Sequence, residues 1–272
     1  TKNPCRQWNS LMSKVIKLHY YRSRSGIPNF GDELSRDVVE FVTGRTVTRS
    51  SRYSADLVAI GSILDRYLSN KGKVASHTRK VLGRPIFVWG SGLIERHKYQ
   101  NTPMHFLAVR GRLTKACLAS ETLALGDPGL FANQIFGAKK KQGIGIVPHY
   151  TDKYHPLIKE LEQLQNVKII DVERSGMDVC RDISGCERIL SSSLHGLIIA
   201  DSFSIPNRRI GFYNNLKGGD FKFEDYASAL GRLDIGITQL AHPDQVKALA
   251  FEEVNFGYQE RVEELCLNLT TA

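Results

Sequence analysis

The fold is decided by one stretch of the chain, Ile189-Leu-Ser-Ser-Ser-Leu-His-Gly-Leu-Ile-Ile-Ala-Asp201. A short apolar run ends at the three serines of residues 191–193, and a longer apolar run with His195 near its start follows at once. A short apolar run closed by polar residues is typical of a buried strand, and the longer run indicates a helix. The stretch therefore predicts a strand that leads directly into a helix, which is the unit of a parallel α/β fold.

The same alternation extends outward from this stretch in both directions. Two series of strands and helices predict an α/β fold with two Rossmann-like lobes, each with a parallel sheet. We expect a basic N-terminal α/β lobe over residues 1–142, a second α/β lobe over residues 143–240, and a C-terminal amphipathic helix over residues 241–272 that packs across the lobes. The predicted strands cover residues 15–21, 57–60, 86–89, 106–109, 144–147, 167–172, 188–190 and 208–212.

The charge of the chain differs between its two halves. Residues 1–142 carry 24 Lys and Arg against 9 Asp and Glu, a net charge of +15, whereas residues 143–272 carry 13 against 19, a net charge of −6. A basic half favours an anionic partner. If the chain works at a membrane, that partner would be an anionic bilayer surface. Trp8, Met12, Lys14 and Lys17 in the first segment suit such a surface. The alternative is that the asymmetry serves solubility alone.

Composition and cysteine usage exclude several classes of protein. The chain is 42% apolar over 272 residues, which is too rich in core-forming residues for a disordered protein. It has no apolar run long enough to span a bilayer, and its start does not resemble a secretory signal. Its five cysteines are scattered and odd in number, which argues against a disulfide framework and a zinc site. We expect a cytoplasmic location.

Ligands of open parallel sheets bind at the carboxyl ends of the strands, so the candidate site residues lie where strands lead into helices. The start of the helix after Ser193 offers free backbone N–H groups to an anion, and His195 adds a titratable group. Arg110 follows a buried strand and suits a carboxylate or a phosphate. The alternatives are a serine helix cap with a structural histidine, and a surface arginine. The predicted anion-binding residues are Arg110, Ser192, Ser193, Leu194 and Gly196.

Two further junctions carry candidate residues. In Asn29-Phe-Gly-Asp-Glu33, Asn29 can cap a helix, Gly31 permits close approach of a ligand, and Asp32 is a candidate base or hydroxyl-binding group. The alternative is a well-formed helix start. His149 lies just past the strand of residues 144–147, and a lone histidine at such a place is often structural.

Several motifs are absent from the sequence. It contains no phosphate-binding P-loop, no HExxH, no GxSxG and no paired DxD carboxylates. A stripe of interleaved aromatic and basic residues, as in nucleic-acid-binding modules, is missing as well. We therefore predict no metal site and no nucleic-acid partner.

Taken together, these junctions resemble the polysaccharide pyruvyl transferase family, in its bacterial exopolysaccharide ketal-forming branch. Five motifs lie in the family's order and cover about residues 15–215. One departure is Ser193, where many members of the family have arginine. The motifs are Asn29-Phe-Gly-Asp32, Val109-Arg-Gly-Arg-Leu-Thr114, Gly126-Asp-Pro128, Val147-Pro-His149 and Ser192-Ser-Leu-His-Gly-Leu-Ile-Ile-Ala-Asp-Ser202.

The resemblance implies a glycosyltransferase-B-like arrangement with the active site in the cleft between the lobes. It implies transfer of pyruvate from phosphoenolpyruvate to a sugar as a cyclic ketal, with release of phosphate and with no cofactor besides the donor substrate. The acceptor would be a lipid-linked oligosaccharide or other saccharide at the inner face of the cell membrane. Asn29 and Gly31 would bind the acceptor.

The chemistry of this reaction suggests roles for the catalytic candidates. His195 would bind the donor and protonate its enol carbon, while Asp32, with His149 as a competitor, would act as base for an acceptor hydroxyl. Two rival functions stay open. The first is a nucleotide-sugar glycosyltransferase of the same architecture, for which Glu252 and Glu260 have the required spacing. The second is a non-catalytic protein that binds anions or nucleic acid.

Overall fold

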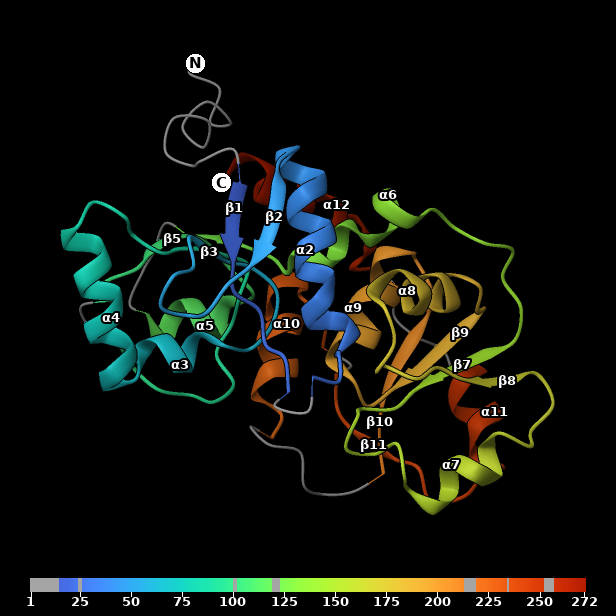
Figure 1. Cartoon of the computed structure of the whole chain (residues 1–272). Helices are drawn as coiled ribbons and strands as arrows, with labels where there is room; N and C mark the ends of the chain where they lie inside the picture. The colour runs from blue at the N-terminus through green and yellow to red at the C-terminus, as the bar shows by residue number, and fades with distance from the viewer. Residues whose placement is uncertain are drawn as a thin grey trace.

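The computed structural model describes residues 15–23, 26–99, 102–118, 123–212, 219–233, 235–251 and 257–272. Trp8, Met12 and Lys14, which the sequence suggested as a membrane-facing segment, lie outside the described residues. The described strands form two sheets, and every pair of neighbouring strands is parallel (Figure 1). The predicted α/β class with two parallel sheets is therefore confirmed.

The first sheet has six strands in the order β2-β1-β3-β4-β5-β6. The chain leaves β1 in one direction and returns for β3 on the other side, so the strand order reverses between β1 and β3. The strands are β1 (Val15–Leu18), β2 (Thr46–Arg49), β3 (Leu57–Val58), β4 (Phe87–Trp89), β5 (His105–Val109) and β6 (Ala124–Leu125). The helices of this half are α2 (Phe30–Thr43), α3 (Leu64–Leu68), α4 (Asn70–Val81), α5 (Arg112–Cys117), the 3-10 helix η1 (Pro128–Phe131) and α6 (Ala132–Phe136).

The second sheet has five strands in the order β11-β10-β9-β7-β8, and its order reverses between β7 and β9. The sheets fall in separate halves of the sequence, while the division into domains at residue 142 stays a prediction. The strands are β7 (Ile144–Val147), β8 (Val167–Ile169), β9 (Arg188–Ser191), β10 (Asn207–Gly211) and β11 (Thr238–Gln239). The helices are α7 (Pro156–Leu161), α8 (Gly176–Ser184), α9 (Leu194–Ser202), α10 (Phe221–Leu230), α11 (Gln245–Phe251) and α12 (Gln259–Thr271).

Helix α2 lies between the two halves and forms as its sequence predicts. The Asn29 side chain caps it by accepting a hydrogen bond from the Gly31 N–H, and the helix ends at Gly44, whose φ of 64° suits glycine. Leu34 and Val38 are fully buried, whereas Phe41, seven residues after Leu34, is exposed. Helix α2 packs against α8 of the second half and against β2 and η1 of the first (Figure 1).

The buried apolar residues form two hydrophobic clusters. One hydrophobic cluster continues from the first sheet through α2 into α8 and α9, and it includes Leu34, Ile183 and Ile198. A smaller cluster lies between the second sheet and the helices α7 and α11, and it includes Leu161 and Val246. The buried strands of both sheets read as continuous apolar runs because helices cover them.

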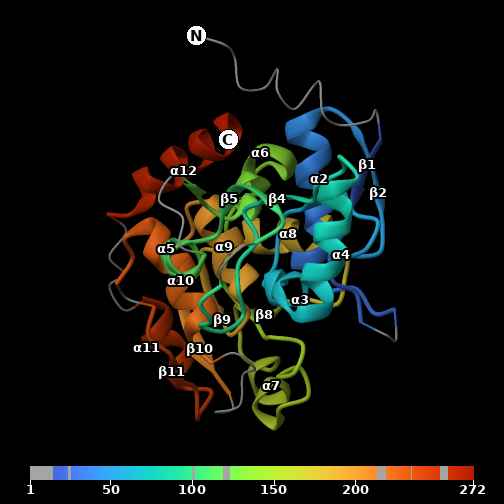
Figure 2. The ribbon, with the colours of Figure 1, turned by 90° about the vertical axis from the view of Figure 1, so that its left-hand side faces the viewer.

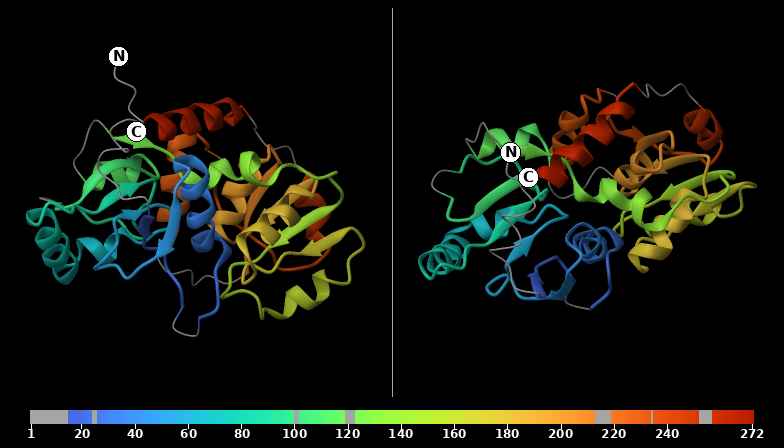
Figure 3. Two further views of the ribbon diagram at one scale, coloured as in Figure 1. Left: turned by 45° about the horizontal axis from the view of Figure 1, so that its top comes forward. Right: turned by 90° about the horizontal axis from the view of Figure 1, so that it is seen from above.

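The single C-terminal helix predicted over residues 241–272 is wrong, because the described residues there form two helices, α11 and α12, and a turn at residues 257–258 precedes α12. Helix α11 packs on β9 and β10, while α12 lies against β6, η1 and α10 (Figures 2 and 3). The Trp89 indole of β4 donates a hydrogen bond to the Leu269 carbonyl at 2.9 Å, and Tyr258 donates to the Asp201 carboxylate of α9 at 2.7 Å. The two helices therefore bury their apolar faces against different parts of the molecule.

Candidate active site

A cavity of about 280 Å³ is lined by residues from both halves of the chain. Its walls come from the segments that follow β1 and β3 in the first sheet and β7 and β9 in the second. These are the two pairs of strands between which the strand order reverses, and ligands of such sheets bind at that point. The cavity brings together six of the residues predicted from the sequence, namely Asn29, Asp32, His149, Ser193, Leu194 and His195.

The junction between β9 and α9 is held by its first two serines and leaves the helix start open. The Ser191 hydroxyl accepts a hydrogen bond from the Ser193 N–H, and the Ser192 hydroxyl donates to Asp152 at 2.6 Å. Both hydroxyls are buried and serve the local structure. Ser193 caps α9 without a side-chain hydrogen bond to the helix start. The N–H groups of the first turn therefore remain available to an anion in the cavity.

Ser192 and Gly196 belong to the predicted anion-binding set, and their contact with a donor stays a prediction. Neither residue is among those that line the cavity. A Cβ atom added at Gly196 would stand 2.3 Å from the Ser191 hydroxyl, so this glycine allows the junction to pack closely. Ser193 and Leu194 are the members of the predicted anion-binding set that line the cavity.

His195 lies against the start of α2. A Cβ atom added at Gly31 would stand 2.1 Å from the His195 Nδ1 atom, so only glycine permits this approach. Gly31 is thus a packing partner of His195 and does not line the cavity. The Nε2 atom is buried and has no hydrogen-bond partner among the described residues. Burial, together with the positive charges of Arg110 and Lys222, lowers the pKa of His195 to about 3, so the imidazole is neutral.

Asp32 is the carboxyl group of the cavity and is 8% exposed. Burial raises the pKa of Asp32 to about 7, and the neighbouring Glu33 adds to the rise. Gly61 lies directly opposite with a φ of 106°, and a Cβ atom there would stand 2.9 Å from Asp32 Oδ1. Near neutral pH, Asp32 can therefore hold a proton and donate it.

His149 lines the cavity two residues after the end of β7. Its Nδ1 atom is 2.7 Å from the Thr151 hydroxyl, and its backbone N–H donates to Ser192. Burial and the charge of Lys222 lower the pKa of His149 to about 3. It is a second neutral imidazole in the cavity.

Two cations of the cavity were missed by the sequence analysis. Lys222 in the first turn of α10 is 8% exposed, and no described residue forms an ion pair or a hydrogen bond with its ammonium group. Burial, with the charges of Arg110 and Arg209, lowers the pKa of Lys222 to about 8. Arg66 of α3 is exposed and lies over the Tyr21 ring, 4.5 Å from its centre. The sequence analysis searched the residues that directly follow predicted strands, and neither cation is among them.

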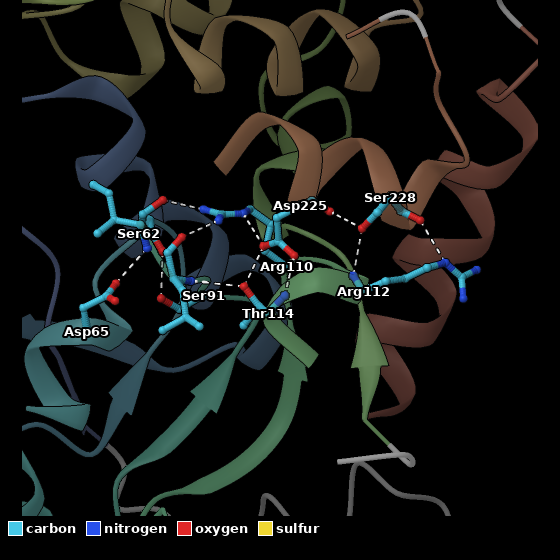
Figure 4. Close-up of polar contacts among 11 residues, drawn as sticks. Ser62, Asp65, Ser91, Arg110, Arg112, Thr114, Asp225 and Ser228 are labelled. Carbon is cyan, nitrogen blue, oxygen red and sulfur yellow. Dashed lines mark hydrogen bonds and ion pairs between the residues drawn. The ribbon is translucent and has the colours of Figure 1, made fainter. Parts of the chain in front are cut away.

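Arg110 occupies a different place from the one predicted. Its guanidinium is fully buried beside the cavity and does not line it. It donates to the Asp225 carboxylate at 3.0 Å and to the Leu93 carbonyl at 2.7 Å, and its third nitrogen donates to Ser62 (Figure 4). In this arrangement each guanidinium nitrogen has a protein partner and the side chain does not line the cavity, so donor binding by Arg110 stays a prediction.

The Arg110–Asp225 pair ties α10 to the first sheet. The backbone N–H and the hydroxyl of Thr114 both donate to Asp225 at 2.7 Å (Figure 4). Asp225 lies three residues after Lys222, about one helical turn along α10. Ser62, which is bonded to Arg110, lines the cavity. The pair therefore fixes the helix turn that carries Lys222 against the cavity wall.

The described residues of the cavity include neither a metal-binding cluster nor the carboxylate pair expected for a glycosyltransferase. Among the described residues, no group of three or more His, Cys, Asp or Glu side chains could hold a metal ion. Glu260 is exposed on α12 and does not line the cavity, and Glu252 lies outside the described residues. The described part of the chain also has no helix that is long and apolar enough to cross a membrane.

Comparison with known proteins identifies the family of this fold and cavity. The chain is 28% identical over 236 residues to the uncharacterized protein L143 of Acanthamoeba polyphaga mimivirus, a match that covers 80% of this chain and 75% of the other. It is also 28% identical over 220 residues to the succinoglycan biosynthesis protein ExoV of Rhizobium meliloti, with 79% of this chain and 65% of that protein covered. No solved structure matches the chain significantly.

The sequence model of the polysaccharide pyruvyl transferase family matches residues 4–212. The matched region includes the segments after β1, β3, β7 and β9 that build the cavity, while Lys222 lies beyond it. The match covers most of the chain, and the chain therefore belongs to the polysaccharide pyruvyl transferase family.

Proposed function

We propose that this protein transfers pyruvate from phosphoenolpyruvate to two hydroxyls of a saccharide, forming a cyclic ketal and releasing phosphate. The observation that carries the proposal is the composition of the cavity. It holds a nearly buried, unpaired lysine ammonium, an open helix start and a carboxyl group that keeps its proton near neutral pH. A donor with a phosphate and a carboxylate needs positive charge and N–H donors, and its enol carbon needs an acid.

Donor binding rests on groups from both halves of the chain. The ammonium of Lys222 and the N–H groups at the start of α9 hold the two anionic groups of phosphoenolpyruvate. Charge-assisted hydrogen bonds in a buried site are the strong ones. Among the described residues, the nearly buried Lys222 ammonium contacts the Phe223 ring but has no hydrogen-bond or ion-pair partner, so the donor would supply one. Arg66 at the cavity wall supplies a further positive charge in place of the arginine that Ser193 replaces.

The proposed reaction uses the cavity's carboxyl group and imidazoles as acid and base. Asp32 protonates the enol carbon C3, and one acceptor hydroxyl adds to the cationic C2. His195 or His149, both neutral, accepts the proton of that hydroxyl. The C2–O bond to phosphate then breaks, and the imidazolium returns its proton to the departing phosphate oxygen. The second hydroxyl closes the ketal and gives its proton to the Asp32 carboxylate, so that both protein groups regain their starting state. The pKa values favour this exchange of roles over the sequence-based assignment, in which His195 was the acid and Asp32 the base.

The acceptor side and the cellular setting belong to the same proposal. Asn29 lines the cavity beside Asp32 and is placed to bind an acceptor hydroxyl. Two parallel sheets with the cavity between their carboxyl ends support a glycosyltransferase-B-like arrangement. The name of the Rhizobium relative favours an exopolysaccharide repeat unit as acceptor. We place the reaction at the inner face of the cell membrane, on a lipid-linked saccharide.

The test is to incubate the protein with phosphoenolpyruvate and a panel of synthetic or lipid-linked saccharides. We expect release of phosphate that depends on the acceptor, and a product heavier than the acceptor by one pyruvate minus water. The control variant is Lys139→Met, an exposed lysine outside the cavity, beside Lys222→Met within it. Transfer of a sugar from a nucleotide-sugar, without consumption of phosphoenolpyruvate, would contradict the proposal.

A further inference from the structure

Helix α4 carries an exposed surface that no other described segment covers. Val74, Val81 and the C-cap residue Leu82 are 68%, 72% and 70% exposed. Val74 and Val81 are seven residues apart, so they lie on one face of the helix, two turns from each other. Aliphatic side chains scattered singly over a surface are ordinary, but three on one short helix form a patch.

The charge around this patch has a single sign. Residues 70–84 contain five Lys and Arg and no Asp or Glu. Lys71, Lys80 and Arg84 are exposed, whereas Arg79 turns inward and pairs with Asp56 at 3.0 Å. The exposed aliphatic residues are therefore bordered by unneutralised cations.

The opposite face of α4 is fixed to the rest of the first half. Gly72 is buried against α3, where a Cβ atom would stand 2.3 Å from the Arg66 carbonyl oxygen. Ser69 links the two helices and caps α4 by accepting a hydrogen bond from the Gly72 N–H. Helix α3 carries Arg66 into the cavity wall, so the exposed surface follows the active site directly in the chain (Figures 1 and 2).

We propose that the exposed face of α4, formed by Lys71, Val74, Lys80, Val81, Leu82 and Arg84, docks on an anionic lipid bilayer. A bilayer surface accepts aliphatic side chains below its headgroups and attracts the surrounding cations. A nucleic acid offers phosphates but no use for three exposed aliphatic residues. A second copy of the chain would bring the same cations against each other. The proposal that α4 binds the bilayer is argued from these residues alone. The purpose of that binding, which is to bring a membrane-bound acceptor to the cavity, rests on the proposed function.

The experiment is co-sedimentation of the full chain with two kinds of vesicle, one of phosphatidylcholine with phosphatidylglycerol and one of phosphatidylcholine alone. We expect binding to the anionic vesicles that weakens with salt. The variant K71Q/K80Q removes two charges and should bind about 25-fold more weakly, at about fivefold for each charge near the surface. The variant V74S/V81S/L82S should lose at least about tenfold, since it removes the inserted aliphatic groups.

Matched controls keep the result specific to α4. K139Q/K140Q removes two exposed lysines elsewhere, and L233S/L267S removes two exposed leucines elsewhere. Both should bind vesicles within about twofold of the unmodified chain. All four variants change exposed side chains, so their thermal unfolding should match that of the unmodified chain.

Three outcomes would overturn the proposal. The first is vesicle binding by V74S/V81S/L82S equal to that of the unmodified chain. The second is equal losses in the control variants. The third is binding to duplex DNA that K71Q/K80Q weakens and the serine variant does not, which would assign the surface to nucleic acid. Phosphate release with a water-soluble acceptor should be the same in all four variants as in the unmodified chain. If the unmodified chain releases no phosphate, the proposed function is contradicted, but the vesicle-binding result is not affected.

Discussion

Replacing Lys222 by methionine should make the ligand-free protein more stable and the donor complex weaker. The pKa of this buried lysine is lowered from 10.5 to about 8. Each tenfold change in proton affinity corresponds to about 1.4 kcal/mol, so the charged form costs the folded state about 3 kcal/mol. Methionine keeps the length and apolar stem of the side chain and removes the charge.

The sign and the pH window of this effect follow from linkage. A lysine whose folded pKa is lowered destabilises the folded state fully below about pH 8, and the penalty disappears as the pH rises from 8 to 10.5. The stability difference between Lys222→Met and the unmodified chain should therefore be largest near neutral pH and shrink above pH 8. At about 2–4 °C for each kcal/mol, thermal unfolding should shift upward by roughly 6–12 °C.

The same substitution should weaken donor binding. A charge-assisted hydrogen bond contributes about 1.5–3 kcal/mol, so the affinity for phosphoenolpyruvate should fall by about 10–150-fold. Thermal unfolding with and without phosphoenolpyruvate measures both effects in one assay, and Lys139→Met should change neither. A Lys222→Met protein that is less stable, or that binds the donor as tightly as the unmodified chain, would refute the reasoning.

Three further substitutions test the other groups of the site. In the unmodified protein, turnover should fall as the pH rises through about 7, because Asp32 loses its proton. The Asp32→Asn variant should turn over about 10²–10⁴-fold more slowly and should not show this fall in rate near pH 7. A normal rate in this variant would mean that Asp32 has a structural role only. His195→Ala should nearly abolish turnover, and more than about a tenth of the activity would exclude His195 from the proton transfer. Arg110→Met leaves Asp225 as a buried charge without its ion-pair partner and should lower the free energy of unfolding in urea by about 3–5 kcal/mol. Unchanged stability with weaker donor binding would instead favour direct contact between Arg110 and the donor.

The parts of the site that could be predicted from the sequence are those formed locally. The run around residues 189–201 carries both the buried strand and the helix start, so β9, α9 and the place of His195 follow from residues next to each other. The same holds for Asn29 and Asp32 at the start of α2. Because parallel strands end on one edge of a sheet, local junctions also predict which residues meet in the cavity.

The parts that could not be predicted depend on contacts between distant segments. Arg110 and Asp225 are 115 residues apart, and their ion pair decides that Arg110 is buried. Lys222 enters the cavity because that pair holds α10, a contact that no local spacing carries. The prediction of one C-terminal helix fails for another reason. Val246 and Leu265 are buried in different hydrophobic clusters, and the helical spacing of apolar residues is the same whether they belong to one helix or to two.

The charge asymmetry and the donor site act over different distances. The acidic half, with a net charge of −6, supplies Lys222 and the start of α9, the groups that we propose hold the anionic donor. Surface charges farther away than about 8 Å are screened at physiological ionic strength, whereas a nearly buried ammonium is not. Donor affinity therefore depends on a few desolvated groups and not on the net charge around them. The net charge of +15 in the other half matters for contact with a large anionic surface, which many cations can approach at once. The exposed cations of α4 are placed for contact with a surface of this kind.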